Sequence, residues 1–200
     1  MSPAQQPMLS RRTLLQHSGR WAAGGGLAGV LAAVAHASVE ATVLPLELVG
    51  ELPQAQALGT ARLRFLGLDI YEARLWAPRS FVSTAYAQSP FALELTYLRS
   101  LSGRRIAERS LQEMRRQGSF GTAREAVWLD AMLQTFADVQ NGDRFTGLHT
   151  PGAGARFWLN GQARAPVRDA EFSRVFFGIW LADASSEPQL RASLLGHAAP

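Results

Sequence analysis

Two arginines at alternate positions of an apolar segment are the residues best placed to do chemistry. Arg62 and Arg64 alternate with Leu63 and Phe65, a period of two that predicts a β-strand with both guanidinium groups on one face. Neighbouring like charges repel, so this face is either solvated, which the pattern alone favours, or holds an anion. If helices cover the face, the arginines need a carboxylate or a bound anion, because a buried unpaired guanidinium is very costly. Arginine suits a carboxylate because its planar fork binds both oxygens.

Other chemistry finds little support in the sequence. The chain has no cysteine, which excludes thiolate catalysis, cysteine zinc sites and iron–sulfur clusters. His149 and His197 lie in different predicted elements and have no partners at metal-ligand spacing. No nucleophile elbow and no phosphate-binding loop are present. We therefore expect no metal site and no cofactor.

The first 37 residues have the layout of an export signal. Ser10-Arg11-Arg12 opens a twin-arginine pattern, an apolar run follows over residues 21–35, and Ala35-His36-Ala37 is a small-x-small cleavage site. The run is shorter than the ~20 residues that a membrane span needs. We expect residues 1–37 to be a cleaved signal of the twin-arginine type, with a general secretory signal as the alternative. The protein is then periplasmic and keeps no stable membrane span.

Removal of this segment changes the charge of the chain. The full sequence has a formal charge of +4, but Arg11, Arg12 and Arg20 leave with the signal and no acidic residue does. The remaining chain has 17 arginines against 16 acidic residues. An excess of one positive charge is too small to indicate binding to the phosphates of DNA or RNA, so we expect no nucleic-acid partner.

Residues 38–200 are predicted to form one domain of the α+β class. Alternating or apolar patterns predict strands over residues 41–49, 57–66, 68–76, 91–98, 145–149, 155–159 and 162–167. A helix is predicted over 102–117, where an apolar stripe runs among five arginines, and a second after a capping box at 122–125. Asp169 is expected to cap a third helix, and a second capping box at 186–189 is expected to begin a short fourth helix. This order indicates an antiparallel sheet with helices packed on it.

Three stretches resemble the chalcone isomerase-like family, in its bacterial exported branch. The first, residues 59–76, is a strand bearing Gly59 and Arg62 followed by a strand of the form hydrophobic-Tyr-x-Ala-x-Leu. The second contains Asn141-Gly142-Asp143-Arg144, then Pro151-Gly152-x-Gly154 and Leu159-Asn160-Gly161. The third is residues 172–181 with Leu194-Leu195-Gly196 behind it. The resemblance covers residues 47–196 approximately.

The resemblance implies an open-faced sandwich, in which helices are layered on one face of an antiparallel sheet above a ligand cleft. It also implies two chemistries: closure of a chalcone to a flavanone, or binding of a fatty acid through an arginine and a tyrosine. Arg62 best matches the arginine of the family, with Arg64 as the second choice, and Tyr97 could supply a phenol near the cleft. Tyr71 is expected in the core. The asparagine and threonine of the isomerase find no match in this sequence.

Three functions follow as hypotheses. The first is a non-catalytic binder of a fatty acid or similar amphipathic carboxylate, with Arg62 on the head group and an apolar cleft around the tail. The second is an isomerase or lyase for an enone or phenolic substrate, in which Arg62 stabilises an oxyanion. The third is a structural or partner-binding periplasmic protein without a ligand. The sequence identifies no protein partner.

Overall fold

The computed structural model describes residues 43–196, so the predicted signal at 1–37 lies outside the described residues. The strands are β1 (Gln56–Phe65), β2 (Leu68–Ala77), β3 (Phe91–Tyr97), β4 (Arg144–Thr150), β5 (Gly154–Leu159) and β6 (Gln162–Ala163). The α-helices are α1 (Leu46–Val49), α2 (Gly103–Met114), α3 (Thr122–Thr135), α4 (Ala170–Leu181) and α5 (Pro188–Leu194). Two 3-10 helices, η1 (Ser83–Gln88) and η2 (Arg115–Gln117), complete the set.

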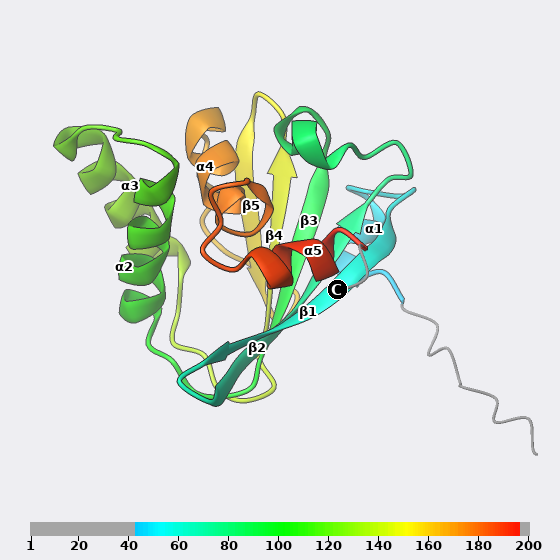
Figure 1. Ribbon diagram of the computed structural model, residues 1–200, viewed down its shortest axis with the longest axis horizontal. Coiled ribbons are helices and arrows are strands. Elements are labelled where there is room, and N and C mark those ends of the chain that lie inside the picture. The colour runs from blue at the N-terminus through cyan, green and yellow to red at the C-terminus, as the bar shows by residue number, and fades with distance from the viewer. Residues whose placement is uncertain (1–42, 197–200) are drawn as a thin grey trace, which may run out of the picture. The chain divides into compact units, whose positions relative to one another are not determined.

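The sheet is a six-stranded antiparallel meander in which every strand pairs with its neighbours in the sequence (Figure 1). Two of its hairpins have two-residue loops whose residues both adopt positive φ, as a type I′ turn requires. Asn160 and Gly161 make the turn between β5 and β6, as predicted, with φ of 51° and 79°. Leu66 and Gly67 make the same turn between β1 and β2, with φ of 49° and 78°.

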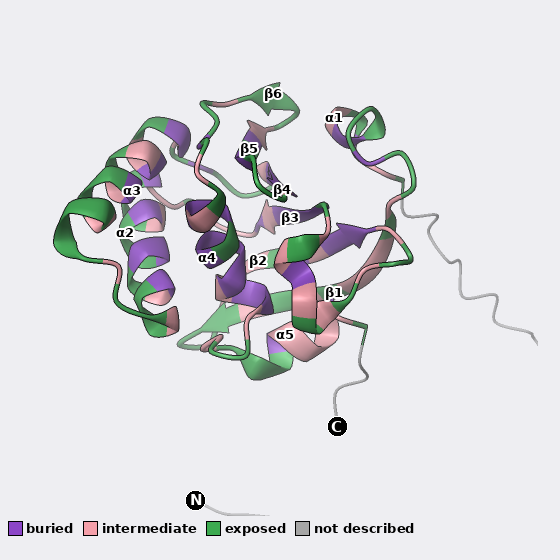
Figure 2. Cartoon of the chain, turned by 90° about the horizontal axis from the view of Figure 1, so that it is seen from above, coloured by how far each residue is buried: buried purple, intermediate pink, exposed green. Residues whose placement is uncertain are grey.

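The main hydrophobic core lies between the inner face of the sheet and helices α2 to α5 (Figures 1 and 2). Alternation places Ala73, Leu75, Leu93 and Leu95 on this face, and all four are buried. Helix α4 packs on β4 and β5 through a cluster of phenylalanine rings, which comprises Phe136, Phe145, Phe157, Phe172, Phe176 and Phe177. The predicted α+β class and the open-faced sandwich are confirmed.

The N-terminal part of the domain differs from the prediction. Residues 41–49 were expected as a strand, but Leu46–Val49 form the short helix α1. The apolar residues of this segment pack on the outer face of the sheet. There Leu48 and Leu52 contact Trp76 and Leu148 in a second, smaller core. A four-residue helix is too short to display a helical period in the sequence.

Both predicted capping boxes are wrong, although their helices are present. Helix α3 begins at Thr122 itself, after an N-cap at Gly121 that makes no side-chain hydrogen bond. Helix α5 has Glu187 as its N-cap, also without a side-chain cap. The cap predicted at Asp169 is confirmed, because its carboxylate accepts a hydrogen bond of 2.9 Å from the Phe172 amide.

A cluster of charged side chains ties α1 to the outer face of the sheet. Arg144 on β4 lies 2.9 Å from Oε1 of Glu47 and 3.5 Å from Oε2 of Glu94. The side chains of Glu47 and Glu94 are only 4% and 8% exposed. Thr146 donates a hydrogen bond of 2.8 Å to Glu47, and Arg74 approaches Glu94 at 3.4 Å. Arg144 is therefore the shared cation of two buried carboxylates.

The last helix lies directly on the first strand. A Cβ atom added to Gly59 on β1 would meet the backbone carbonyl oxygen of Ser193 and lie 2.6 Å from that of Leu194. These contacts are to backbone, which cannot rotate away as a side chain can. Glycine at position 59 thus permits α5 to pack against β1.

His149 joins three elements in the core and is neutral in the folded state. Its Nε2 lies 3.0 Å from the Ala87 carbonyl oxygen and therefore donates, so that Nδ1 accepts from the Ser173 hydroxyl at 2.7 Å. The ring is buried and stacks on Phe91. Burial lowers the pKa of His149 below its ordinary value.

Stability is expected to fall as the pH drops below about 6.5, the ordinary histidine pKa. Below that pH the unfolded chain takes up a proton at position 149 that the folded chain does not bind, so the free energy of unfolding decreases by up to ~1.4 kcal/mol per pH unit. Urea denaturation between pH 7.5 and 5 measures the slope. The slope should flatten in His149→Gln, and an unchanged slope would contradict the assignment. Carboxylates with lowered pKa, such as Asp143 and Asp169, affect stability only at lower pH.

Within residues 43–196, no helix combines the length and the apolar character that crossing a membrane requires.

Candidate functional site

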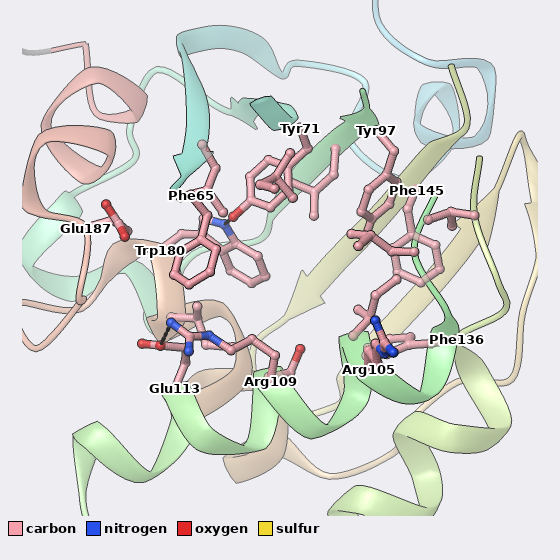
Figure 3. A pocket seen from close by; sticks show the side chains of 18 of the residues that line it. Phe65, Tyr71, Tyr97, Arg105, Arg109, Glu113, Phe136, Phe145, Trp180 and Glu187 are labelled. Carbon is pink, nitrogen blue, oxygen red and sulfur yellow. Dashed lines mark hydrogen bonds and ion pairs between the residues drawn. The ribbon is translucent and has the colours of Figure 1, made fainter. Parts of the chain in front are cut away.

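A cavity of about 300 Å³ lies between the inner face of the sheet and the helices (Figure 3). Its volume is at the lower end of the range of small-molecule sites, ~300–1,000 Å³. Strands β1 to β4 supply one wall, and α2, α4 and α5 supply the other. Its walls are mainly apolar, and the larger apolar side chains are Leu63, Phe65, Leu95, Ile106, Phe136, Phe145, Phe176, Ile179 and Leu190.

Two tyrosines, Tyr97 buried and Tyr71 partly buried, supply hydroxyl groups on the sheet side of the cavity. Tyr71 on β2 and Tyr97 on β3 are register partners, and their rings meet edge to face with centroids 6.1 Å apart. The Tyr71 hydroxyl accepts a hydrogen bond of 3.0 Å from the indole of Trp180 on α4. Burial raises the pKa of both tyrosines well above the ordinary value. Both hydroxyls are therefore protonated and act as hydrogen-bond donors, not as bases.

Charged side chains border the cavity at two separate places. Figure 3 shows Arg109, Glu113 and Glu187 on the side of Trp180, and Arg105 on the side of Tyr97 and Phe136. Arg109 is paired with Glu113 at 2.6 Å. Arg105 forms no ion pair with any of the described residues, although Arg104 beside it pairs with Glu108 at 3.7 Å. Arg105 is thus the cation at the cavity whose charge is available to an anionic ligand.

The structure does not bring Arg62 or Arg64 to this cavity. Their neighbours Leu63 and Phe65 line it, and alternation places both arginines on the outer face. Arg62 pairs with Glu72 and with Asp69, and Arg64 pairs with Asp69. The side chains of Arg62 and Arg64 are 45% and 68% exposed. The solvated face that the pattern favoured is confirmed.

A second hollow of about 270 Å³ adjoins Arg62 on the outer face. It is bordered by Arg62, Glu72, Arg74, Glu94 and Thr96. The carboxylates pair with the arginines, since Glu72 binds Arg62 and Glu94 lies 3.4 Å from Arg74. This hollow therefore presents charges that are already paired with one another.

Tyr97 lies at the cavity, where sequence reasoning expected it, whereas Arg105 and Arg109 were not singled out. Tyr71 was expected in the core; it is partly buried against the core and lines the cavity. The spacing of the two arginines, four residues apart beside Ile106, places them at the edge of the apolar stripe of α2. That spacing was visible in the sequence, although an amphipathic helix bears arginines at such positions for solubility too.

The arrangement provides binding groups and few catalytic ones. Histidine and aspartate are absent from the described lining of the cavity, and so are the threonine and asparagine that the isomerase chemistry calls for. The protonated tyrosines can donate to a carboxylate or a ketone oxygen. Apolar walls, two phenolic donors and the guanidinium of Arg105, which is unpaired within the described part of the chain, suit a molecule with an apolar body and an anionic or polar end.

Comparisons with known proteins agree with the fold. A family model described as chalcone isomerase-like matches residues 57–196. A curated protein of Haemophilus influenzae without an assigned function is 29% identical over 109 residues, which are 54% of this chain and 53% of that protein. The chain thus spans about half the length of this relative. A solved fatty-acid binding protein of Arabidopsis thaliana shares the fold, with a TM-score of 0.56 and 12% identity over 72% of this chain and 87% of the plant protein.

Proposed function

The chain belongs to the chalcone isomerase-like family, and we propose that it binds a fatty acid or a similar amphipathic carboxylate without catalysing a reaction. The observation that carries this proposal is the apolar cavity, bordered by an arginine that has no acidic partner among residues 43–196. The fold that the chain shares with a plant fatty-acid binding protein supports it. The predicted export signal makes the periplasm the compartment of this proposed activity.

The cavity suggests how such a ligand is oriented. The tail lies among the apolar side chains, where its removal from water contributes about 25 cal/mol per Å² of buried apolar surface. The carboxylate lies on the side of Arg105 and Tyr97, where a guanidinium and a phenolic hydroxyl can both donate to it. The other charged border is less suitable for an anion, because Arg109 is already paired and Glu187 adds a negative charge.

An isomerase or lyase acting on an enone or phenolic substrate is the second candidate. Tyr71 and Tyr97 favour it to a limited degree, because a protonated phenol can polarise a ketone oxygen. The chemistry also needs a cation for the substrate phenolate; Arg62 lies on the opposite face of the sheet, so Arg105 at the border of the cavity would have to take this role. Turnover of a chalcone by the purified protein would support this candidate against simple binding.

Arg105→Gln is expected to weaken palmitate binding by about tenfold to a hundredfold, the loss typical of one hydrogen bond to a charged group. Isothermal titration calorimetry measures the affinity, and native mass spectrometry identifies any lipid that co-purifies. The methyl ester of palmitate should bind the wild type and Arg105→Gln equally, because it carries no charge.

Two matched arginine variants control this experiment. Arg104→Gln removes the adjacent charge, which does not line the cavity, and Arg62→Gln removes the arginine that the sequence alone favours. Both should retain the affinity of the wild type. Loss of binding in Arg62→Gln with none in Arg105→Gln would instead restore the assignment made from the sequence. Absence of any binding by the wild type would favour a protein that has no ligand.

A further inference from the structure

The hydroxyl proton of Tyr71 has no acceptor in the described part of the chain. The Tyr71 oxygen accepts a hydrogen bond of 3.0 Å from the Trp180 indole, and an indole N–H can only donate. The proton on this oxygen therefore points away from Trp180, and no group among residues 43–196 accepts it. Because Tyr71 lines the cavity, its proton is available to a ligand there.

A carboxylate that also lines the cavity has one oxygen without a hydrogen bond. The Glu113 side chain is 11% exposed, and its Oε1 lies 2.6 Å from Arg109. Its other oxygen, Oε2, is buried and accepts no hydrogen bond from the described residues, since Arg116 approaches it only to 3.7 Å. Buried polar atoms without partners are rare in folded proteins and are destabilising. Glu113 therefore has capacity for a further donor.

Tyr71 and Glu113 border the same side of the cavity. Burial raises the pKa of Tyr71, and the negative charges of Glu187 and Glu113 raise it further, because they disfavour a phenolate close to them. Figure 3 shows both carboxylates on the side of Trp180, away from Arg105. A hydrogen-bond donor and a hydrogen-bond acceptor thus occur together at the side of the cavity that is remote from Arg105.

We propose that the ligand carries a hydroxyl group at the end remote from its carboxylate, as an ω-hydroxy fatty acid does. This inference rests on the proposed function and names the class of fatty acid. A hydroxyl group can accept from Tyr71 and donate to Glu113 at the same time. A methyl end leaves both protein groups without partners. A ketone accepts but does not donate, and an ammonium group donates but does not accept.

Helix α2 determines the length of such a ligand. Arg105 and Glu113 both border the cavity and lie eight residues apart on α2, which corresponds to about 12 Å at the helical rise of 1.5 Å per residue. An extended chain advances about 3.3–3.6 Å for every three bonds, so about ten or eleven bonds separate the carboxyl carbon from the carbon that carries the hydroxyl. A probe of this length is 12-hydroxydodecanoate.

Three ligands of equal chain length test the proposal by isothermal titration calorimetry with purified, delipidated protein. They are dodecanoate, 12-hydroxydodecanoate and its isomer 2-hydroxydodecanoate. The wild type should bind 12-hydroxydodecanoate about tenfold more tightly than dodecanoate, because one hydroxyl supplies partners to two protein groups. The 2-hydroxy isomer should show no such gain, since its hydroxyl lies beside the carboxylate. Equal affinities for the two isomers would overturn the proposal and indicate that water supplies the partners of Tyr71 and Glu113.

Two matched tyrosine variants locate the effect. Tyr71→Phe should bind dodecanoate as the wild type does, which also shows that the variant is folded, and should lose the preference for 12-hydroxydodecanoate. Tyr97→Phe removes a hydroxyl on the side of Arg105, so it should weaken all three ligands and keep the preference. A Tyr71→Phe variant that keeps the full preference would contradict the assignment.

Palmitate separates this inference from the proposed function on which it rests. If palmitate binds and the terminal hydroxyl brings no gain in affinity, the inference fails and the proposed function stands. If neither palmitate nor any of the three shorter ligands binds, the proposed function fails as well.

Discussion

Arg144→Met is expected to lower the free energy of unfolding by about 3–5 kcal/mol, the range for removing one partner of a buried ion pair. The methionine keeps the apolar stem but leaves Glu47 and Glu94 without the cation that they share. Glu47 then has only the Thr146 hydroxyl, and Glu94 has only Arg74, at 3.4 Å. Urea denaturation at pH 7 measures the change.

Two further variants show whether the buried charges are the cause. Arg104→Met removes an exposed pair on α2 and should change the stability by less than about 1 kcal/mol. Glu47→Gln added to Arg144→Met should recover part of the loss, because one of the two stranded charges is removed. A loss below about 1 kcal/mol in Arg144→Met would mean that water solvates these carboxylates.

Gly59→Ala is expected to destabilise the domain by about 1–3 kcal/mol or more, because overpacking against backbone forces the neighbouring element to move. The added methyl group would displace α5, which carries Leu190 and so part of the cavity wall. Weaker binding of an apolar ligand should accompany the loss of stability. Thermal unfolding and ligand titration on the same sample measure both effects.

Gly50→Ala is the control for this substitution. Gly50 follows α1 with an ordinary φ of −81°, and nothing lies within 4 Å of an added Cβ atom. It should be nearly neutral, since surface substitutions usually change stability by no more than ~0.5 kcal/mol. Equal stability of Gly59→Ala and the wild type would show that α5 shifts on β1 without loss.

The strands and their two faces could be predicted because alternation is a local property. The pattern at residues 62–65 separated Arg62 and Arg64 from Leu63 and Phe65 as the structure does. It did not reveal which face the helices cover, since that depends on β2 and β3, where Ala73 and Leu95 point inward. The assignment of Arg62 to a ligand assumed that its face looks into the cleft, and one strand cannot decide this.

The cavity arginines were harder to predict for a different reason. Arg105 lies on an amphipathic helix, where arginine ordinarily marks the solvated side. Its proposed role in binding a ligand depends on its position at the edge of α2 that borders the cavity, and on the absence of an acidic partner among the described residues. Both are properties of packing between segments far apart in the sequence.

Several residues that carry the family resemblance have structural explanations. Gly59 admits α5, Arg144 neutralises two buried carboxylates, and Asn160-Gly161 makes a turn. Gly178 lies so close to the Tyr86 hydroxyl that an added Cβ atom would be 2.7 Å from it. The residues that carry the family resemblance are therefore mostly those that the close contacts of the fold require. The candidate ligand-binding residues are not among these motifs.

The contact between α5 and β1 also orders events during synthesis of the chain. Each hairpin of the meander can form as soon as its second strand leaves the ribosome, because the pairing is between neighbours. The inner face of β1 stays uncovered until residues 188–194 arrive, about 130 residues after Gly59. The nascent protein consequently exposes one apolar strand face through most of its translation, and the domain closes only when its last helix is made.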